Sequence, residues 1–118
     1  MNNISRFTFD DQQHQLIVNR ENQQDAWQFS YEFLRVVNLT GDAKQPLATN
    51  QKDARITNIE SVGKYGYRFI FNDGHNVVYH DDDLALMHVQ HDNLWQQYLN
   101  AIKASGLSRE ATIEIKQL

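Results

Sequence analysis

The chain has 118 residues, of which 41% are hydrophobic and 22% charged, a composition typical of one small globular domain rather than a disordered chain. Its net charge is −4 and its basic residues are scattered, which argues against nucleic-acid binding because that function relies on clustered Lys and Arg. Cysteine is absent, so disulfides, thiolate metal sites and cysteine nucleophiles are excluded.

The N-terminal part predicts three short strands. Residues 4–9 alternate apolar and polar side chains and place Phe7 and Phe9 on one face, as a half-buried strand requires. A polar turn follows, and residues 14–19 predict a second strand antiparallel to the first. Residues 26–29 predict a short third strand.

A helix and a long loop come next. Ser30 is suited to cap the helix because its hydroxyl can accept a hydrogen bond from a free backbone N–H, and apolar residues recur at helical spacing over 33–37. Residues 38–53 lack periodicity and contain Gly41 and the single proline, Pro46. We therefore expect an exposed, flexible loop there.

The central region predicts three further strands. Residues 56–62 open it, and residues 65–71 put four aromatic side chains on one strand face. Asp73 and Gly74 indicate a turn, since Gly74 accepts a positive φ, and residues 77–80 form the returning strand.

The C-terminal part predicts two helices and a last strand. Asp81 or Asp82 is suited to cap the first helix and Asp92 the second, which ends at Gly106. Residues 111–117 alternate apolar and polar side chains and predict an extra strand that covers a sheet edge.

Together these elements predict an α+β fold. We expect residues 1–118 to form a single domain, with an antiparallel β-sheet of about five or six strands and two or three packed helices.

Three segments of the chain resemble a known family. They read YEFLRV over residues 31–36, IESVGKYGYRFIFNDGH over 59–75 and LWQQYL over 94–99. In this order and spacing they resemble the N-terminal domain of gamma-butyrobetaine hydroxylases, which also occurs as short stand-alone bacterial proteins. The resemblance implies a domain that precedes a catalytic barrel, makes subunit contacts and is not itself the catalyst.

The same resemblance implies a zinc site that this chain does not reproduce. In the family three cysteines follow the Leu-Arg pair, and a histidine follows the turn glycine. The cysteine positions correspond to Asn38, Thr40 and Ala43, and only the histidine, His75, is present. We therefore expect no cofactor. Related domains fused to P-loop iron–sulfur carriers suggest a role near iron–sulfur or oxygenase systems.

Histidines and aspartates leave a metal site open as an alternative. His80 and Asp82 form an H-x-D pair, the first two ligands of a 2-His-1-carboxylate iron site, but too few residues follow for the barrel that carries such a site. A site for iron or zinc built from His75, His80 and Asp82 remains chemically possible, although it requires separate segments to converge.

Other polar and aromatic residues are candidates for structural or interaction roles. Arg35 and Arg68 are expected to be partly buried and to pair with acids such as Glu32 or Glu60. Trp95 lies in the apolar stripe of the last helix and becomes a partner-surface candidate if that stripe is exposed. The full set of candidates is Arg35, Arg68, Asp73, Gly74, His75 and Trp95.

The sequence thus predicts a non-catalytic accessory or protein-interaction domain, not an enzyme. Its expected partner is another protein or a second copy of the chain. No nucleic acid or membrane partner is expected, because the basic residues are scattered and no apolar run reaches membrane-spanning length. The N-terminus also lacks an apolar signal segment, which favours the cytoplasm.

Overall fold

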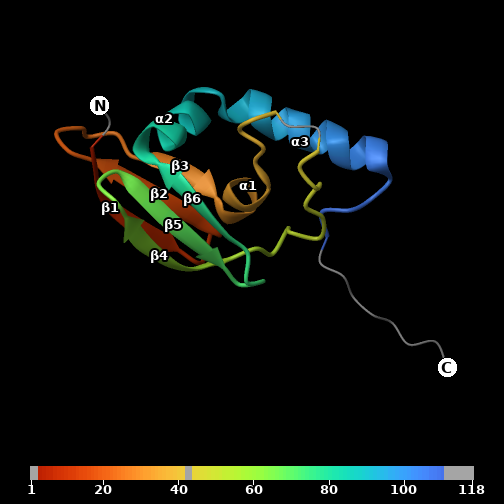
Figure 1. Ribbon diagram of the computed structural model, residues 1–118, viewed down its shortest axis with the longest axis horizontal. Helices are drawn as coiled ribbons and strands as arrows, with labels where there is room; N and C mark the ends of the chain where they lie inside the picture. The colour runs from red at the N-terminus through yellow and green to blue at the C-terminus, as the bar shows by residue number, and fades with distance from the viewer. Residues whose placement is uncertain (1–2, 42–43, 111–118) are drawn as a thin grey trace.

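The computed structural model describes residues 3–41 and 44–110 and has two three-stranded antiparallel sheets packed with three helices (Figure 1). The predicted α+β class is confirmed, with six strands and three helices in the described part of the chain. The first three strands form one sheet and the last three form the other, and a helix and a long connection separate the third strand from the fourth. The strand predicted over residues 111–117 lies outside the described residues. No helix in the described ranges is long and apolar enough to cross a bilayer.

The first sheet has the strand order β1-β2-β3. Its strands are β1 (Ile4–Asp10), β2 (Gln15–Arg20) and β3 (Trp27–Ser30). The pairing of β1 with β2 shifts register between Ile4 and Arg6, so Ile4 and Phe7 both pack against the core although they are three residues apart. Phe9, expected on the same half-buried face as Phe7, is instead 42% exposed.

The second sheet has the order β4-β5-β6, with both pairings antiparallel. Its strands are β4 (Ile56–Val62), β5 (Gly66–Phe71) and β6 (Asn76–His80). The predicted aromatic face of β5 is present, with Phe69 and Phe71 fully buried and Tyr67 half-buried. Gly74 lies in the turn before β6 with φ 85°, a conformation that favours glycine.

Aromatic rings join the two sheets. Phe7 of the first sheet meets Tyr67 and Phe69 of the second edge to face, with ring centroids 5.0 and 5.8 Å apart. Phe69 also meets Tyr79 of β6 at 5.4 Å. Each such pair contributes about 0.5–1.5 kcal/mol beyond the burial of its apolar area. The sheets consequently hold each other through side chains, and among the described strands no hydrogen-bonded pair joins them.

The three helices are α1 (Tyr31–Val36), α2 (Asp81–Val89) and α3 (His91–Ser105). The predicted Ser30 cap of α1 is confirmed, because its hydroxyl accepts a 3.0 Å hydrogen bond from the backbone N–H of Phe33. The predicted end of α3 at Gly106 is also confirmed, with φ 73°.

The predicted caps of α2 and α3 are wrong. The capping position of α2 is His80, and Asp81 and Asp82 already lie in the first helical turn. Asp83 accepts a 2.8 Å hydrogen bond from the backbone N–H of His80, and this capping-box contact sets the start of the helix. Asp92 lies in the first turn of α3 rather than before it, because α3 begins almost directly after α2.

The connection from α1 to β4 contains the predicted loop over residues 38–53 and has no regular secondary structure in its described part. It is attached to the segment that follows α3. The backbone N–H groups of Asn50 and Lys52 donate 2.8 Å hydrogen bonds to the carbonyl groups of Ser108 and Arg109. The flexibility of this loop stays a prediction.

Candidate functional site

A groove of about 720 Å³ lies along β6 and is the candidate functional site. It is lined by the end of α1, by the connection that follows α1, and by β6 itself, which lies beside α1 in Figure 1. We call it the β6 groove. Its lining residues are drawn from 35–40, 45–51 and 75–79, together with Asp83.

The backbone of β6 is open on the side that faces away from β5. β6 is an edge strand, and hydrogen bonds at its two ends run from Phe71 N–H to the His75 carbonyl and from Asp81 N–H to the Tyr65 carbonyl. Because backbone groups alternate along an antiparallel strand, those of residues 77 and 79 also point toward β5. Those of residues 76 and 78 point away.

Among the described residues, no hydrogen bond outside the sheet ladder uses the backbone groups of Asn76 or Val78. The outward N–H of His80, by contrast, is bound by Asp83. The free edge of β6 therefore offers two consecutive outward positions that can pair with another extended chain.

Apolar side chains surround this open edge. Val36 and Val37 at the end of α1 are buried. Leu39 and Leu47 in the connection, and Val77 in β6, are half-buried and pack against buried residues of the two core clusters. A strand edge next to apolar side chains can bind both the backbone and alternate side chains of an extended segment.

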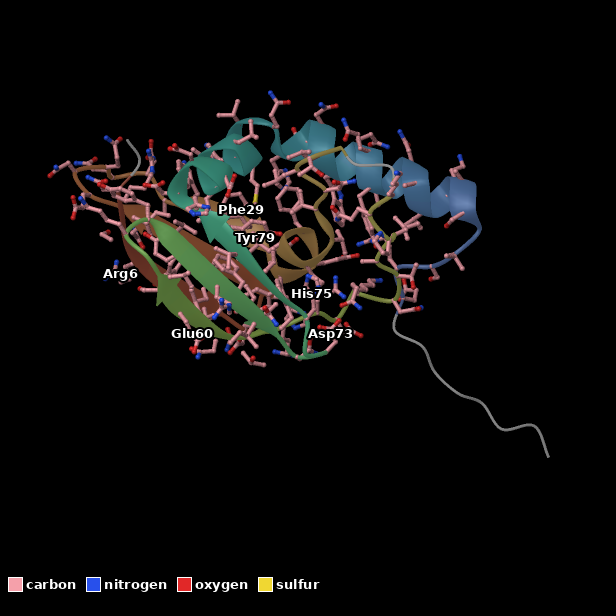
Figure 2. The ribbon with its side chains drawn as sticks, in the orientation of Figure 1. Arg6, Phe29, Glu60, Asp73, His75 and Tyr79 are labelled. Carbon is pink, nitrogen blue, oxygen red and sulfur yellow. The ribbon has the colours of Figure 1, made fainter. Side chains whose placement is uncertain are left out.

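An ion pair closes the end of the groove at which β6 begins. Arg35 of α1 donates from Nε and Nη2 to Oδ2 of Asp73, at 3.0 and 2.9 Å. The other carboxylate oxygen of Asp73 accepts the backbone N–H of His75 at 3.1 Å. Figure 2 shows Asp73 and His75 at the tip of the β5–β6 hairpin and Tyr79 further along β6. Four of the predicted candidates, Arg35, Asp73, Gly74 and His75, thus lie together.

The ion pair and burial set the charges at this end. Burial alone would raise the pKa of Asp73, but hydrogen bonds from Arg35 and from the backbone N–H of His75 outweigh burial and lower it. The pKa of His75 is lowered, first by burial and then by the charge of Arg35. The His75 ring is accordingly neutral at pH 7. Among the described residues, Arg35 and not the His75 ring provides the hydrogen bond from α1 to this turn.

The predicted partner Glu32 for Arg35 is wrong. α1 directs Arg35 to the turn after β5 and Glu32 to the segment after α3. There, Arg109 donates two 2.8 Å hydrogen bonds to the two carboxylate oxygens of Glu32. No local pattern indicates this pair, since its members are 77 residues apart in the chain.

Two of the predicted candidates lie outside the groove. Arg68 is on β5 and is half-buried, as expected, and its guanidinium approaches the predicted partner Glu60 at 3.9 Å. Trp95 is half-buried in α3 and packs against Tyr98, with ring centroids 5.5 Å apart. The guanidinium carbon of Arg109 lies 5.1 Å from the Trp95 ring. Trp95 therefore fixes the segment after α3 instead of forming an exposed patch.

The residues of the alternative metal site do not converge. His80 Nδ1 lies 3.5 Å from Oδ2 of Asp83, so the carboxylate beside His80 is that of Asp83 and not that of Asp82. His75 lies at the other end of β6. Within residues 3–41 and 44–110, no group of three or more His, Cys, Asp or Glu side chains is placed to hold a metal ion.

The residues at the implied zinc positions do not fit that site. Asn38 and Thr40 carry oxygen donors in place of thiolates, and Asn38 Oδ1 already accepts hydrogen bonds from Thr40 Oγ1 and the backbone N–H of Gly41. Ala43 has no donor in its side chain. Only His75 remains as a zinc ligand of the usual kind.

Sequence reasoning missed the open edge and the apolar wall of the groove. A sequence indication for the edge did exist: β6 is followed directly by a helix, so a partner on its second side has to come from elsewhere in the chain. The wall formed by Leu39 and Leu47 had no such indication, because two leucines in an irregular connection show no periodicity.

A family model matches most of the chain. The model for "Gamma-butyrobetaine hydroxylase-like, N-terminal" matches residues 7–84, which include the second half of β1, the elements from β2 to β6 and the start of α2. No curated protein matches the chain.

Solved structures share the fold. Two NMR solution structures have a TM-score of 0.77 at 24% identity, cover 100% of this chain, and are themselves covered over 92% and 98% of their lengths. A crystal structure of a protein with unknown function from Acidithiobacillus ferrooxidans, which belongs to the DUF971 family, has a TM-score of 0.56 at 18% identity. That match covers 69% of this chain and 86% of the other. At these identities the structures show the fold alone.

Proposed function

Because the chain belongs to the gamma-butyrobetaine hydroxylase-like N-terminal family, we propose that it is a non-catalytic accessory domain that binds another protein. In the hydroxylases the corresponding domain precedes the catalytic barrel, and a role in contacts between chains suits its position. The proposal includes a cytoplasmic location and a link to iron–sulfur or oxygenase systems.

The observation that carries the proposal is the β6 groove. It combines outward backbone groups at Asn76 and Val78 with the apolar side chains of Val37, Leu39 and Leu47. Domains that bind peptides by strand addition use these two features, because the backbone bonds supply affinity and the side-chain positions supply specificity. The partner expected here is an extended segment with apolar residues at every second position.

The polar end of the groove supports a binding role over a catalytic one. Asp73 is held as an ionised carboxylate by Arg35, and a paired carboxylate is a poor general base. His75 is neutral, but among the described residues its ring has no hydrogen bond to a nucleophile or to an orienting acid. The perturbed pKa values have a structural cause in burial and the ion pair.

A pair of proline variants tests the proposal. Asn76→Pro removes an outward N–H at the first residue of an edge strand, where proline is tolerated. Ser61→Pro is the matched control, because Ser61 lies on β4, the opposite edge strand of the same sheet, and its N–H also points away from β5. Both variants should fold, as judged by circular dichroism and melting temperature.

The readout is affinity capture from native cell extract, with quantitative mass spectrometry. A partner retained by wild type and Ser61→Pro but reduced about tenfold or more by Asn76→Pro is the expected result. Equal capture by all three proteins would place the interaction elsewhere. Elemental analysis of the same samples follows metal content, and stoichiometric metal after purification without chelator would favour the alternative metal-binding function.

A further inference from the structure

The described chain ends beside the β6 groove. The carbonyl oxygen of Glu110 accepts a 2.7 Å hydrogen bond from Asn50 Nδ2, and Lys52 Nζ lies 2.9 Å from Glu110 Oε1. Thr49 and Gln51, the neighbours of Asn50, both line the groove. Residues 111–118 therefore start from a point next to it.

The exit point is fixed by buried contacts. Arg109 binds Glu32 of α1 through two 2.8 Å hydrogen bonds, and the carboxylate side chain of Glu32 is only 8% exposed. Arg109 also lies over the Trp95 ring of α3. The start of the C-terminal segment is consequently attached to two helices, which limits the directions it can take.

The sequence of residues 111–118, ATIEIKQL, has the chemistry that the groove requires. In an extended conformation Ile113 and Ile115 lie on one face, and Thr112, Glu114 and Lys116 lie on the other. The segment has no proline, so each residue can donate and accept backbone hydrogen bonds. Its extended length of about 26 Å exceeds the roughly 17 Å of a five-residue strand and leaves residues to span the approach.

The opposite edge of the same sheet is less suited to this segment. On β4 the outward N–H of Ile59 is already bound by Asn58 Oδ1 at 2.9 Å. Its neighbours Thr57, Glu60 and Ser61 are polar and exposed. β6 instead combines free outward groups with an apolar wall.

From these observations we propose that residues 111–118 bind in the β6 groove of their own chain as a fourth strand beside β6. Arg55 and Asn72 are hydrogen-bonded to each other, so the connection that holds Glu110 reaches the sheet where β6 is about to begin. The segment accordingly runs parallel to β6. A protein partner that uses the groove has to displace it, which makes the segment autoinhibitory, but its docking does not depend on the existence of such a partner.

Hydrogen exchange of the full chain and of a chain that ends at Glu110 tests the docking. In the full chain the amides of Asn76 and Val78 are protected, and truncation speeds their exchange by about tenfold or more, while the Ser61 amide on β4 is unchanged. A synthetic peptide of residues 110–118 added to the truncated chain restores the protection. Equal exchange of Asn76 and Val78 in both chains overturns the proposal.

Two charge-matched double variants of the full chain separate docking from nonspecific effects. Ile113→Asp with Ile115→Asp places charges on the apolar face and reproduces the fast exchange of the truncated chain. Thr112→Asp with Lys116→Gln changes the net charge equally on the other face and keeps the protection. Protection that disappears on dilution, together with a dimer by light scattering, overturns docking within one chain and assigns the groove to a second copy. Because the amides that decide the outcome lie on β6 itself, the test stands whether or not affinity capture finds a partner.

Discussion

Replacing Asp73 by Asn tests the ion pair at the end of the β6 groove. Arg35 donates from Nε at 3.0 Å and from Nη2 at 2.9 Å to one carboxylate oxygen, and the Arg35 and Asp73 side chains are 15% and 33% exposed. A hydrogen bond to a charged group contributes about 1.5–3 kcal/mol. Solvent at Asp73 reduces this, and Asn still accepts a neutral hydrogen bond, so the free energy of unfolding should fall by about 1–2 kcal/mol.

The effect of Asp73→Asn should depend on pH in one direction. The pKa of Asp73 is lowered in the folded chain, where hydrogen bonds from Arg35 and the His75 backbone outweigh burial. A lowered folded pKa gives stability that is fully present above the unfolded value and is lost as the pH falls through the folded value. The gap between wild type and variant is therefore complete at neutral pH and closes below about pH 4.

Urea denaturation followed by circular dichroism measures the free energy of unfolding of wild type and Asp73→Asn at neutral pH and in acid. The matched control is Glu60→Gln, which removes a 3.9 Å contact with Arg68 between two half-exposed side chains and should change stability by less than about 0.5 kcal/mol. Asp73→Asn should lower the melting temperature at pH 7 by roughly 5–10 °C. Equal stability of Asp73→Asn and wild type at pH 7, or a gap that persists in acid, would refute the assigned role of the pair.

Three further substitutions probe the scaffold, each by chemical denaturation. Arg109→Ala leaves the nearly buried carboxyl group of Glu32 without its partner, so the free energy of unfolding should fall by about 2–4 kcal/mol, whereas Arg109→Lys should recover part of the loss. Tyr79→Phe removes the buried 2.9 Å hydrogen bond to the Leu34 carbonyl and should cost about 1–2 kcal/mol, with no change in secondary structure. Gly66→Ala would place its Cβ 2.6 Å from a backbone oxygen at the end of β4, so a destabilisation below about 1 kcal/mol would contradict the close approach.

The elements that the sequence predicted well are those with a local cause. The Ser30 cap, the Gly106 end and the alternating aromatic residues of β5 each depend on neighbours within a few positions. The start of α2 was predicted too late, because the decisive contact is that of Asp83 with the backbone of His80, and three consecutive aspartates do not indicate which of them makes it. The register shift within β1, which lets Ile4 and Phe7 both pack against the core, also has no indication in the sequence.

The sequence identified several residues of the candidate site but did not predict how they are arranged in space. Arg35, Asp73 and His75 were singled out from residue type and turn chemistry, yet their assembly requires contact between residues 38 positions apart. The division of the strands into two sheets, which makes β6 an edge, also depends on long-range packing. The β6 groove therefore became visible only in three dimensions.

The missing cysteines bear on how the connection after α1 is held beside the β6 groove. The resemblance places a zinc ion between the segment after α1 and the turn that carries His75. In this chain the same turn and β6 are joined to α1 itself, through Arg35 with Asp73 and through Tyr79 with the Leu34 carbonyl. Thiolate ligands would instead attach the connection that follows α1 to the start of β6. In this chain the connection is held by the packing of Leu39 and Leu47 and by backbone hydrogen bonds to the segment after α3, and the space between it and the free edge of β6 is the β6 groove.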